Sequence, residues 1–167
     1  MRSGFVVLTD RYIYSPMARA EVRGIDSAWI RSIYSMALVP DAVFYLRIST
    51  PQQLVERVLS SGRGFDYWES GMDLHLGEDF YDSFIEYQTR MLKVFDRMSN
   101  EYGFHVLNAS RSVRSVAADL RRAVTKLIDE PGGSEDKVSP IQPLREKVSG
   151  PLKTPVNVVD LNKKVLP

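Results

Sequence analysis

Cysteine is absent from the 167-residue chain, which excludes disulfide bonds and thiolate metal ligands. No run approaches the roughly 18 consecutive apolar residues that a membrane-spanning helix needs, and the N-terminal MRSGFVVLTDR lacks the long apolar segment of a signal peptide. An excess of charge is also missing, since a net charge of +1 gives no electrostatic case for nucleic acid as the main partner. We therefore expect a cytoplasmic protein with neither a membrane nor a nucleic-acid partner.

Aromatic residues and prolines divide the chain into two parts. Every Phe, Trp and Tyr lies between Phe5 and Phe104, whereas six of the nine prolines lie from Pro131 onward. The later part is rich in Pro, Gly, Ser and mixed charge, and it cannot bury enough apolar surface to offset its ordering entropy. We predict a folded domain over residues 1–128 and a flexible, disordered tail over residues 129–167. A short strand or docking motif at VNVVDL, residues 156–161, is the alternative for part of that tail.

Strand and helix patterns alternate within the predicted domain. A continuous apolar run typical of a parallel strand occurs at FVVL (5–8), and further strands are predicted at AVFYLRI (42–48) and FHVLNA (104–109). Helices are predicted from Asp26 to before Pro40, from Thr50 to about Leu59 with a Thr50/Gln53 capping box, from Glu78 to Gly103, and from about Ser112. This alternation indicates an α/β fold with a parallel sheet and flanking helices.

Asp10 and Arg11 follow the first predicted strand directly. Ligands of parallel α/β sheets bind beyond the carboxyl ends of the strands. A carboxylate there could order a metal-bound water, and a guanidinium could bind phosphate oxygens through two parallel hydrogen bonds. Taken alone, the pair is explained better by an ordinary ion pair at the surface.

A longer set of motifs surrounds this pair. In order they are DRYIYS (10–15), RGID (23–26), PDAVFYLRISTPQQLVERV (40–58), YWE (67–69) and FHVLNASRSV (104–113). In this order and spacing the chain resembles thymidylate kinase, in the P-loop group of nucleoside monophosphate kinases, over about residues 3–126. The resemblance implies a P-loop kinase-like fold and phosphoryl transfer from ATP, bound with Mg²⁺, to dTMP. The base is not fixed by these residues, so another nucleotide is the alternative acceptor.

The resemblance also implies roles for residues near the first motif. It makes Arg11 a catalytic residue that contacts the phosphate of dTMP. Asp10, also catalytic, would lie near the transferred phosphoryl group and reach the metal through water. Ser15 would approach the acceptor nucleotide. Arg19 follows on the same segment, but the resemblance transfers no role to it, and a helix surface explains it equally well.

ERVLSSGRGFDYWE, residues 56–69, would form a lid that closes over the phosphates. The resemblance makes Arg57 and Arg63 its cations, with Arg63 also catalytic. Glu69 matches the family pattern and Trp68 keeps an aromatic ring, so both are implied to bind the acceptor. Tyr67 stands where family lids carry a cation, and packing of the two aromatic rings beneath the long helix is an equal alternative.

Ser110 and Arg111 follow the last predicted strand and match the loop that borders the ATP adenine. A helix-start serine followed by a solvated arginine would explain them without a ligand. Neither histidine is expected to act as a catalyst or ligand. His75 lies beside Asp73, Glu78 and Asp79, which could suggest a metal, but one histidine among loop carboxylates is more often part of a solvated cap region, and His105 lies within a strand pattern.

The P-loop motif G-x-x-x-x-G-K-[ST], which holds the ATP phosphates in this family, occurs nowhere in the 167 residues. The resemblance therefore implies an incomplete fold, in which the missing P-loop strand would lie between FVVL and AVFYL. Three explanations are open: the C-terminal part of a longer kinase, which we favour; a subunit whose partner chain supplies the P-loop; and a non-catalytic binding or regulatory module. In the first two, this chain would be inactive alone. A homodimer is also left open.

Overall fold

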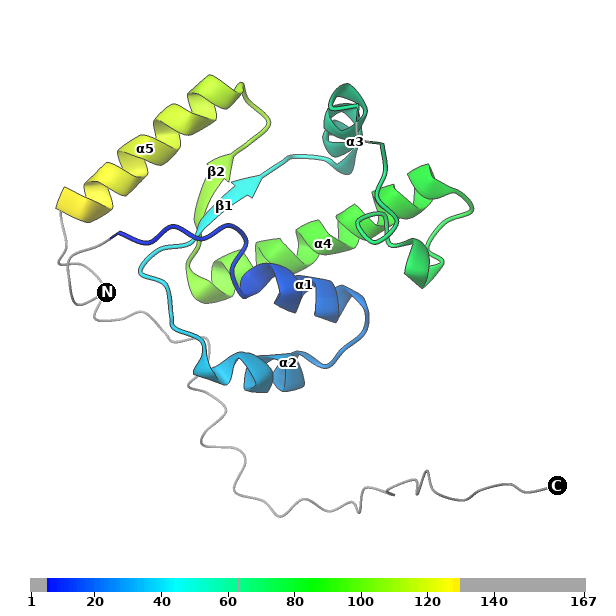
Figure 1. The fold of residues 1–167 in the computed structure, drawn as a ribbon, viewed down its shortest axis with the longest axis horizontal. Coiled ribbons are helices and arrows are strands. Elements are labelled where there is room, and N and C mark those ends of the chain that lie inside the picture. Colours follow the sequence, from blue (N-terminus) through cyan, green and yellow to red (C-terminus); the bar gives the residue numbers. More distant parts are fainter. Residues whose placement is uncertain (1–5, 63, 130–167) are drawn as a thin grey trace, which may run out of the picture.

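The computed structural model describes residues 6–62 and 64–129, in an α/β arrangement of a small parallel sheet and flanking helices (Figure 1). The elements are α1 (Tyr14–Val22), α2 (Ser27–Ile33), the 3₁₀ helix η1 (Tyr34–Met36), β1 (Phe44–Arg47), α3 (Pro51–Ser60), the 3₁₀ helix η2 (Met72–Leu74), α4 (Phe80–Tyr102), β2 (His105–Asn108) and α5 (Val113–Asp129). Arg63 and the predicted tail from residue 130 lie outside the described residues.

The sheet consists of β1 and β2, which pair in parallel from Phe44 opposite His105 to Arg47 opposite Asn108. The His105 amide donates to the Val43 carbonyl at 2.8 Å, and the Ala109 amide donates to the Arg47 carbonyl at 2.8 Å. These strands confirm the strands predicted at 42–48 and 104–109, at slightly shorter lengths. Figure 1 shows α4 and α5 on either side of the strand pair.

The prediction of a strand over residues 5–8 is wrong for the part that is described. Val6, Val7 and Leu8 are exposed and form no strand. A strand requires a neighbour to pair with, and among the described residues β1 and β2 pair only with each other. In a parallel pair, alternate residues point their backbone groups to opposite edges, so Phe44 and Leu46 present an open edge of β1 on the side away from β2.

Two predicted helix starts have different outcomes. Asp26 caps α2 as expected, because its Oδ1 accepts a hydrogen bond from the Trp29 amide at 2.9 Å. The capping box at the start of α3 is wrong: Thr50 makes no side-chain cap, and Gln53 Oε1 accepts a hydrogen bond from Ser110 Oγ at 2.7 Å. The glutamine side chain therefore joins α3 to the loop after β2.

The long predicted helix is confirmed as α4. Asp79 Oδ1 caps its start by accepting from the Asp82 amide at 2.8 Å, and Gly103 ends it with a φ of 65°. This is the left-handed conformation that glycine adopts at helix C-termini. β2 begins two residues later, so the glycine turns the chain directly into the sheet.

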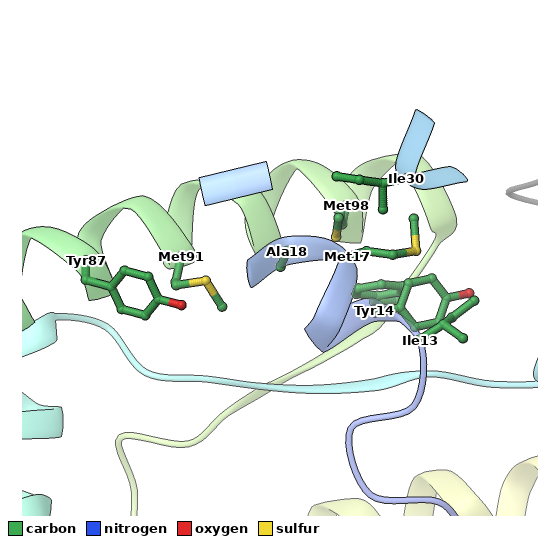
Figure 2. Packing of buried hydrophobic residues seen from close by; sticks show 9 residues of the cluster. Ile13, Tyr14, Met17, Ala18, Ile30, Tyr87, Met91 and Met98 are labelled. Carbon is green, nitrogen blue, oxygen red and sulfur yellow. The ribbon is translucent and has the colours of Figure 1, made fainter. Parts of the chain in front are cut away.

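The core lies where α1 packs between α2 and α4 (Figure 2). Ala18 is fully buried, and its small side chain allows α1 to approach α4 closely. The buried cluster contains Ile13, Tyr14, Met17, Ala18, Ile30, Tyr87, Met91, Met98 and Phe104. This packing fixes α1, and with it the Asp-Arg-Tyr segment that immediately precedes the helix.

Candidate active site

The segment before α1 contains a turn with unusual backbone angles. Arg11 has a φ of 64° and Tyr12 a φ of 24°, values that residues other than glycine rarely adopt. The Tyr12 amide donates to the Asp10 carbonyl at 2.9 Å, and the Tyr12 hydroxyl donates to the Leu38 carbonyl at 2.9 Å. Backbone strain of this kind persists where the surrounding structure enforces it and is concentrated at functional sites. The turn fixes where the Arg11 side chain leaves the backbone.

Arg11 and a second arginine meet at one carboxylate oxygen. Arg11 Nη1 lies 3.3 Å from Glu69 Oε1, and Arg19 Nη2 lies 2.9 Å from the same atom. Arg19 projects from α1, whereas Glu69 belongs to the turn before η2. The arrangement is therefore a two-arginine cluster closed by one carboxylate, which we call the Arg11–Arg19–Glu69 cluster.

Arg23, one helical turn beyond Arg19, joins α1 to the segment that carries Glu69. Its Nε and Nη2 donate to the two oxygens of Asp73 at 3.0 and 3.2 Å, and its Nη1 donates to the Tyr87 hydroxyl at 2.8 Å. Nη2 also donates to the Trp68 carbonyl at 3.2 Å. Burial lowers the pKa of Arg23, but its hydrogen bonds to Asp73 and Tyr87 outweigh that effect and raise the pKa overall. Arg23 thus stays charged and holds the segment in place.

The backbone of the turn around Glu69 is held at several points. Asp66 Oδ1 accepts from the amides of Trp68 and Glu69 at 2.9 and 3.0 Å, and Gln88 Nε2 donates to the Glu69 carbonyl at 3.0 Å. Gly71 allows the turn to lie directly on Tyr87, because a Cβ at position 71 would be 2.7 Å from Tyr87 Cδ2. The Glu69 backbone is therefore fixed, while its side chain is half exposed.

A second group of predicted residues lies at the carboxyl ends of β1 and β2. Ser110 Oγ accepts from the Ser49 amide at 3.1 Å, and the Arg57 guanidinium donates to the Ala109 carbonyl. Arg111 instead pairs with Asp119 of α5. The ends of the two strands and the start of α3 therefore form one joined surface, at the edge where ligands of such sheets bind.

Comparison with known proteins identifies the group to which this arrangement belongs. The family model described as thymidylate kinase matches residues 1–120. The chain belongs to the thymidylate kinase family.

Individual relatives agree with this assignment. The chain is 35% identical to a probable thymidylate kinase 2 of Saccharolobus solfataricus over 131 residues, which are 77% of this chain and 61% of that protein. It is 28% identical to a probable thymidylate kinase of Caldivirga maquilingensis over 72% of this chain and 51% of that protein. With the thymidylate kinase of Arabidopsis thaliana the identity is 25%, over 78% of this chain and 42% of that protein. The chain thus spans between two fifths and three fifths of the length of these relatives.

Among the residues that the family resemblance implied, the structure brings Arg11 and Glu69 into contact, and it gathers Arg57 and Ser110 at the end of β2. Asp10 is exposed beside Arg11, and Ser15 is half-buried in the first turn of α1. Arg111 faces α5 through its pair with Asp119. These positions leave the implied roles as proposals.

The two aromatic residues of the predicted lid do not pack beneath α4. Trp68 is 60% exposed and contacts the Tyr67 ring edge-on at 5.3 Å. The Phe65 ring packs on α4, with its centroid 5.0 Å from that of the Phe84 ring. The Trp68 ring is therefore available to a ligand.

From the sequence, Arg19 was left open between the acceptor side and a helix surface, and Arg23 was given no role near Arg11. The available signal was their spacing: residues four apart lie on the same face of a helix, so both arginines follow Arg11 on one side of α1. No helix bounds were predicted over residues 14–22, so this spacing was not applied to Arg23.

A dedicated metal centre is not formed by the described ranges, in which no group of three or more Asp, Glu, His or Cys residues converges. Mg²⁺ commonly binds through one or two carboxylates together with substrate phosphates and water. Asp10 beside Arg11 fits that limited protein contribution.

Within the same described ranges, no helix is long and apolar enough to cross a membrane.

Proposed function

We propose that this chain forms the acceptor side of a thymidylate kinase that transfers the γ-phosphoryl group of ATP to dTMP, giving dTDP and ADP. The observation that carries the proposal is the position of Arg11, which a strained turn holds in contact with a carboxylate anion in a member of this family. A guanidinium binds phosphate and carboxylate oxygens in the same way. The acceptor phosphate is the anion that this site is suited to hold.

In the proposed reaction, a phosphate oxygen of dTMP attacks the γ-phosphorus of ATP, and the bond from that phosphorus to the β–γ bridging oxygen breaks. Such transfers depend on positioning and charge neutralisation. Arg11 holds the attacking phosphate, and Asp10 would hold the metal through a water molecule. Mg²⁺, when bound with ATP, neutralises charge on the donor phosphates.

The remaining proposed roles concern residues near Arg11 and residues near the carboxyl ends of β1 and β2. Trp68 offers an exposed ring to the thymine base, and Ser15 and Glu69 lie on the acceptor side. Arg57 and Arg63 supply positive charge to the transferred group, with Arg63 catalytic. Ser110 and Arg111 border the adenine of ATP.

We propose that the cradle for the ATP phosphates comes from residues outside this sequence, in the same polypeptide or in a partner chain. Two observations support this. The P-loop motif is absent from the 167 residues, and within the part of the chain that the structure describes the edge of β1 away from β2 is unpaired and Val6–Leu8 is an exposed apolar run. A strand carrying the P-loop would pair with that edge and bring the donor phosphates to Arg11.

The test measures ADP formation with Mg-ATP and dTMP. The 167-residue chain alone should give no ADP above the buffer rate, and addition of the P-loop-bearing segment or partner should produce dTMP-dependent ADP. In that reconstituted enzyme, Arg11→Ala should lower kcat/KM for dTMP by about a hundredfold, as expected for one charged donor in a dry site. Arg11→Lys should recover part of the loss, because an ammonium keeps the charge but not the guanidinium geometry.

The matched control is Arg90→Ala, which removes an exposed guanidinium that pairs with Glu86 within α4 and should leave kcat/KM unchanged. Robust ADP formation by the chain alone would contradict the assignment of the ATP cradle. Full activity of Arg11→Ala would contradict the assignment of Arg11. Binding of dTMP without ADP formation in any reconstitution would favour a non-catalytic binding module.

A further inference from the structure

The Arg11–Arg19–Glu69 cluster carries an inference that rests on the proposed function and extends it. We propose that Arg19 is a second arginine ligand for the acceptor phosphate, and that the Glu69 carboxylate is an internal substitute for that phosphate which dTMP displaces. The assignment of Arg19 follows from its contact with the same oxygen as Arg11. It favours the acceptor side over the helix surface, the two explanations that the sequence left open for Arg19.

The geometry supports the first half of the proposal. Arg11 Nη1 and Arg19 Nη2 lie 3.3 and 2.9 Å from one atom, Glu69 Oε1, although the two arginines leave the chain eight positions apart. Two guanidinium groups that converge on a single oxygen define a point where an anion is stabilised by charge-assisted hydrogen bonds. Glu69 Oε1 marks that point.

The charges favour phosphate over carboxylate at this point. Two arginines bring two positive charges, whereas Glu69 brings one negative charge. A phosphate monoester carries roughly two negative charges near pH 7 and offers three terminal oxygens. It would therefore balance the pair of arginines more completely, and it could engage further N–H donors on each guanidinium.

Exposure makes the exchange feasible. The side chains of Arg11, Arg19 and Glu69 are 59%, 36% and 47% exposed, and ion pairs with this much exposure contribute little to stability. Asp66 and Gln88 hold the Glu69 backbone, so its side chain can rotate away without movement of the turn.

Arg23 is the natural rival for the role of second ligand, and its contacts argue against it. Its guanidinium is already shared among Asp73, the Tyr87 hydroxyl and the Trp68 carbonyl. Displacing it would leave Asp73 without this partner in a half-buried position. Arg23 therefore supports the segment, and Arg19 has the capacity to bind a ligand.

The experiment measures the affinity of the 167-residue chain for dTMP, thymidine and inorganic phosphate by isothermal titration calorimetry. Arg19→Ala should weaken dTMP binding by about tenfold or more, the loss expected for a hydrogen bond between charged groups, and should leave thymidine binding unchanged. Glu69→Gln should strengthen the binding of both dTMP and phosphate, because the neutral amide competes less well for the two arginines. Arg19→Lys should recover part of the affinity for dTMP.

Matched controls come from the ion pair between Arg31 and Glu101, which has a similar distance of 2.9 Å and lies outside the cluster. Arg31→Ala and Glu101→Gln should change none of the three affinities. The inference is overturned if Arg19→Ala behaves like Arg31→Ala, if Glu69→Gln weakens dTMP binding, or if the unmodified chain binds neither phosphate nor dTMP.

Failure of this inference can be distinguished from failure of the proposed function. If phosphate binding requires both arginines but dTMP binds no more tightly than dAMP, the two-arginine site stands and the thymidylate acceptor is wrong. If the chain binds dTMP more tightly than dAMP but Arg19→Ala leaves the affinity for dTMP unchanged, the acceptor assignment stands and the inference about Arg19 is wrong.

Discussion

Replacing Arg23 with alanine should destabilise the protein by about 2 to 3 kcal/mol. The change removes both hydrogen bonds to Asp73 and the hydrogen bond to the Tyr87 hydroxyl. Breaking a fully buried ion pair costs about 3 to 5 kcal/mol. Arg23 and Asp73 are 23% and 19% exposed, so water partly compensates the abandoned carboxylate and the expected cost falls below that range.

The assay is urea unfolding followed by far-UV circular dichroism. A lower midpoint at an unchanged slope would report the loss of stability. Arg90→Ala is the control, since Arg90 and Glu86 are each 45% exposed and such pairs contribute about 0.5 kcal/mol or less. Adding Asp73→Asn to Arg23→Ala should recover part of the stability, because the unpaired carboxylate is then neutral. Equal losses for Arg23→Ala and Arg90→Ala would refute the structural role assigned to Arg23.

Two further outcomes can be measured in the same way. Gly71→Ala should lower the free energy of unfolding by about 2 to 4 kcal/mol, because the new Cβ would lie 2.7 Å from Tyr87 Cδ2 at a φ of +64°. Gly24→Ala, at a φ of +83° in open space, should lower it by about 1 kcal/mol from backbone strain alone. Equal losses for the two variants would rule out the close approach of Gly71 to Tyr87. Burial raises the pKa of Tyr45 and of Tyr102 to about 12, so their contribution to stability should be complete below about pH 10 and lost as the pH rises from 10 toward 12, by about 1.4 kcal/mol per pH unit for each tyrosine. Unfolding free energies measured across that interval check the second expectation, and a loss unaffected by Tyr45→Phe would contradict it for Tyr45.

The elements that could be predicted from the sequence are those with local signals. α4 combines a long helical period with Asp79 at its start and Gly103 at its end, and both residues act through contacts within a few positions. β1 and β2 lie within short segments rich in apolar and aromatic residues, which indicate strands without reference to a partner. Asp26 likewise caps α2 through a residue three positions away.

The wrong predictions concern residues whose structure depends on a partner far away in the sequence. Residues 6–8 have the apolar composition of a strand, but composition cannot supply the neighbouring strand that pairing requires. Gln53 has the right spacing for a capping box, but Ser110, 57 positions later, takes its side chain. No helix was predicted over α1, whose start has no side-chain cap, and Pro16 fits the first turn of that helix, where the N–H is not needed.

The residues of the candidate site also divide into those that the sequence predicted and those that depend on distant contacts. Arg11 and Glu69 were predicted because the family resemblance marks both. Their contact, across 58 positions, could not be deduced from spacing. Arg19 and Arg23 contact partners 50 positions away, and only a folded chain shows that both arginines point toward the segment around Glu69 and Asp73.

The placement of α1 has a consequence for how this chain can evolve. One face of the helix carries Met17 and Ala18 in the core, and another carries Arg19 toward Glu69, so a single rigid element serves both purposes. A larger residue at position 18 would shift or rotate the helix and would carry the guanidinium away from its anion. Substitutions at Ala18 should therefore reduce activity before they prevent folding. Among active descendants, the residue at position 18 should vary less than packing alone would require.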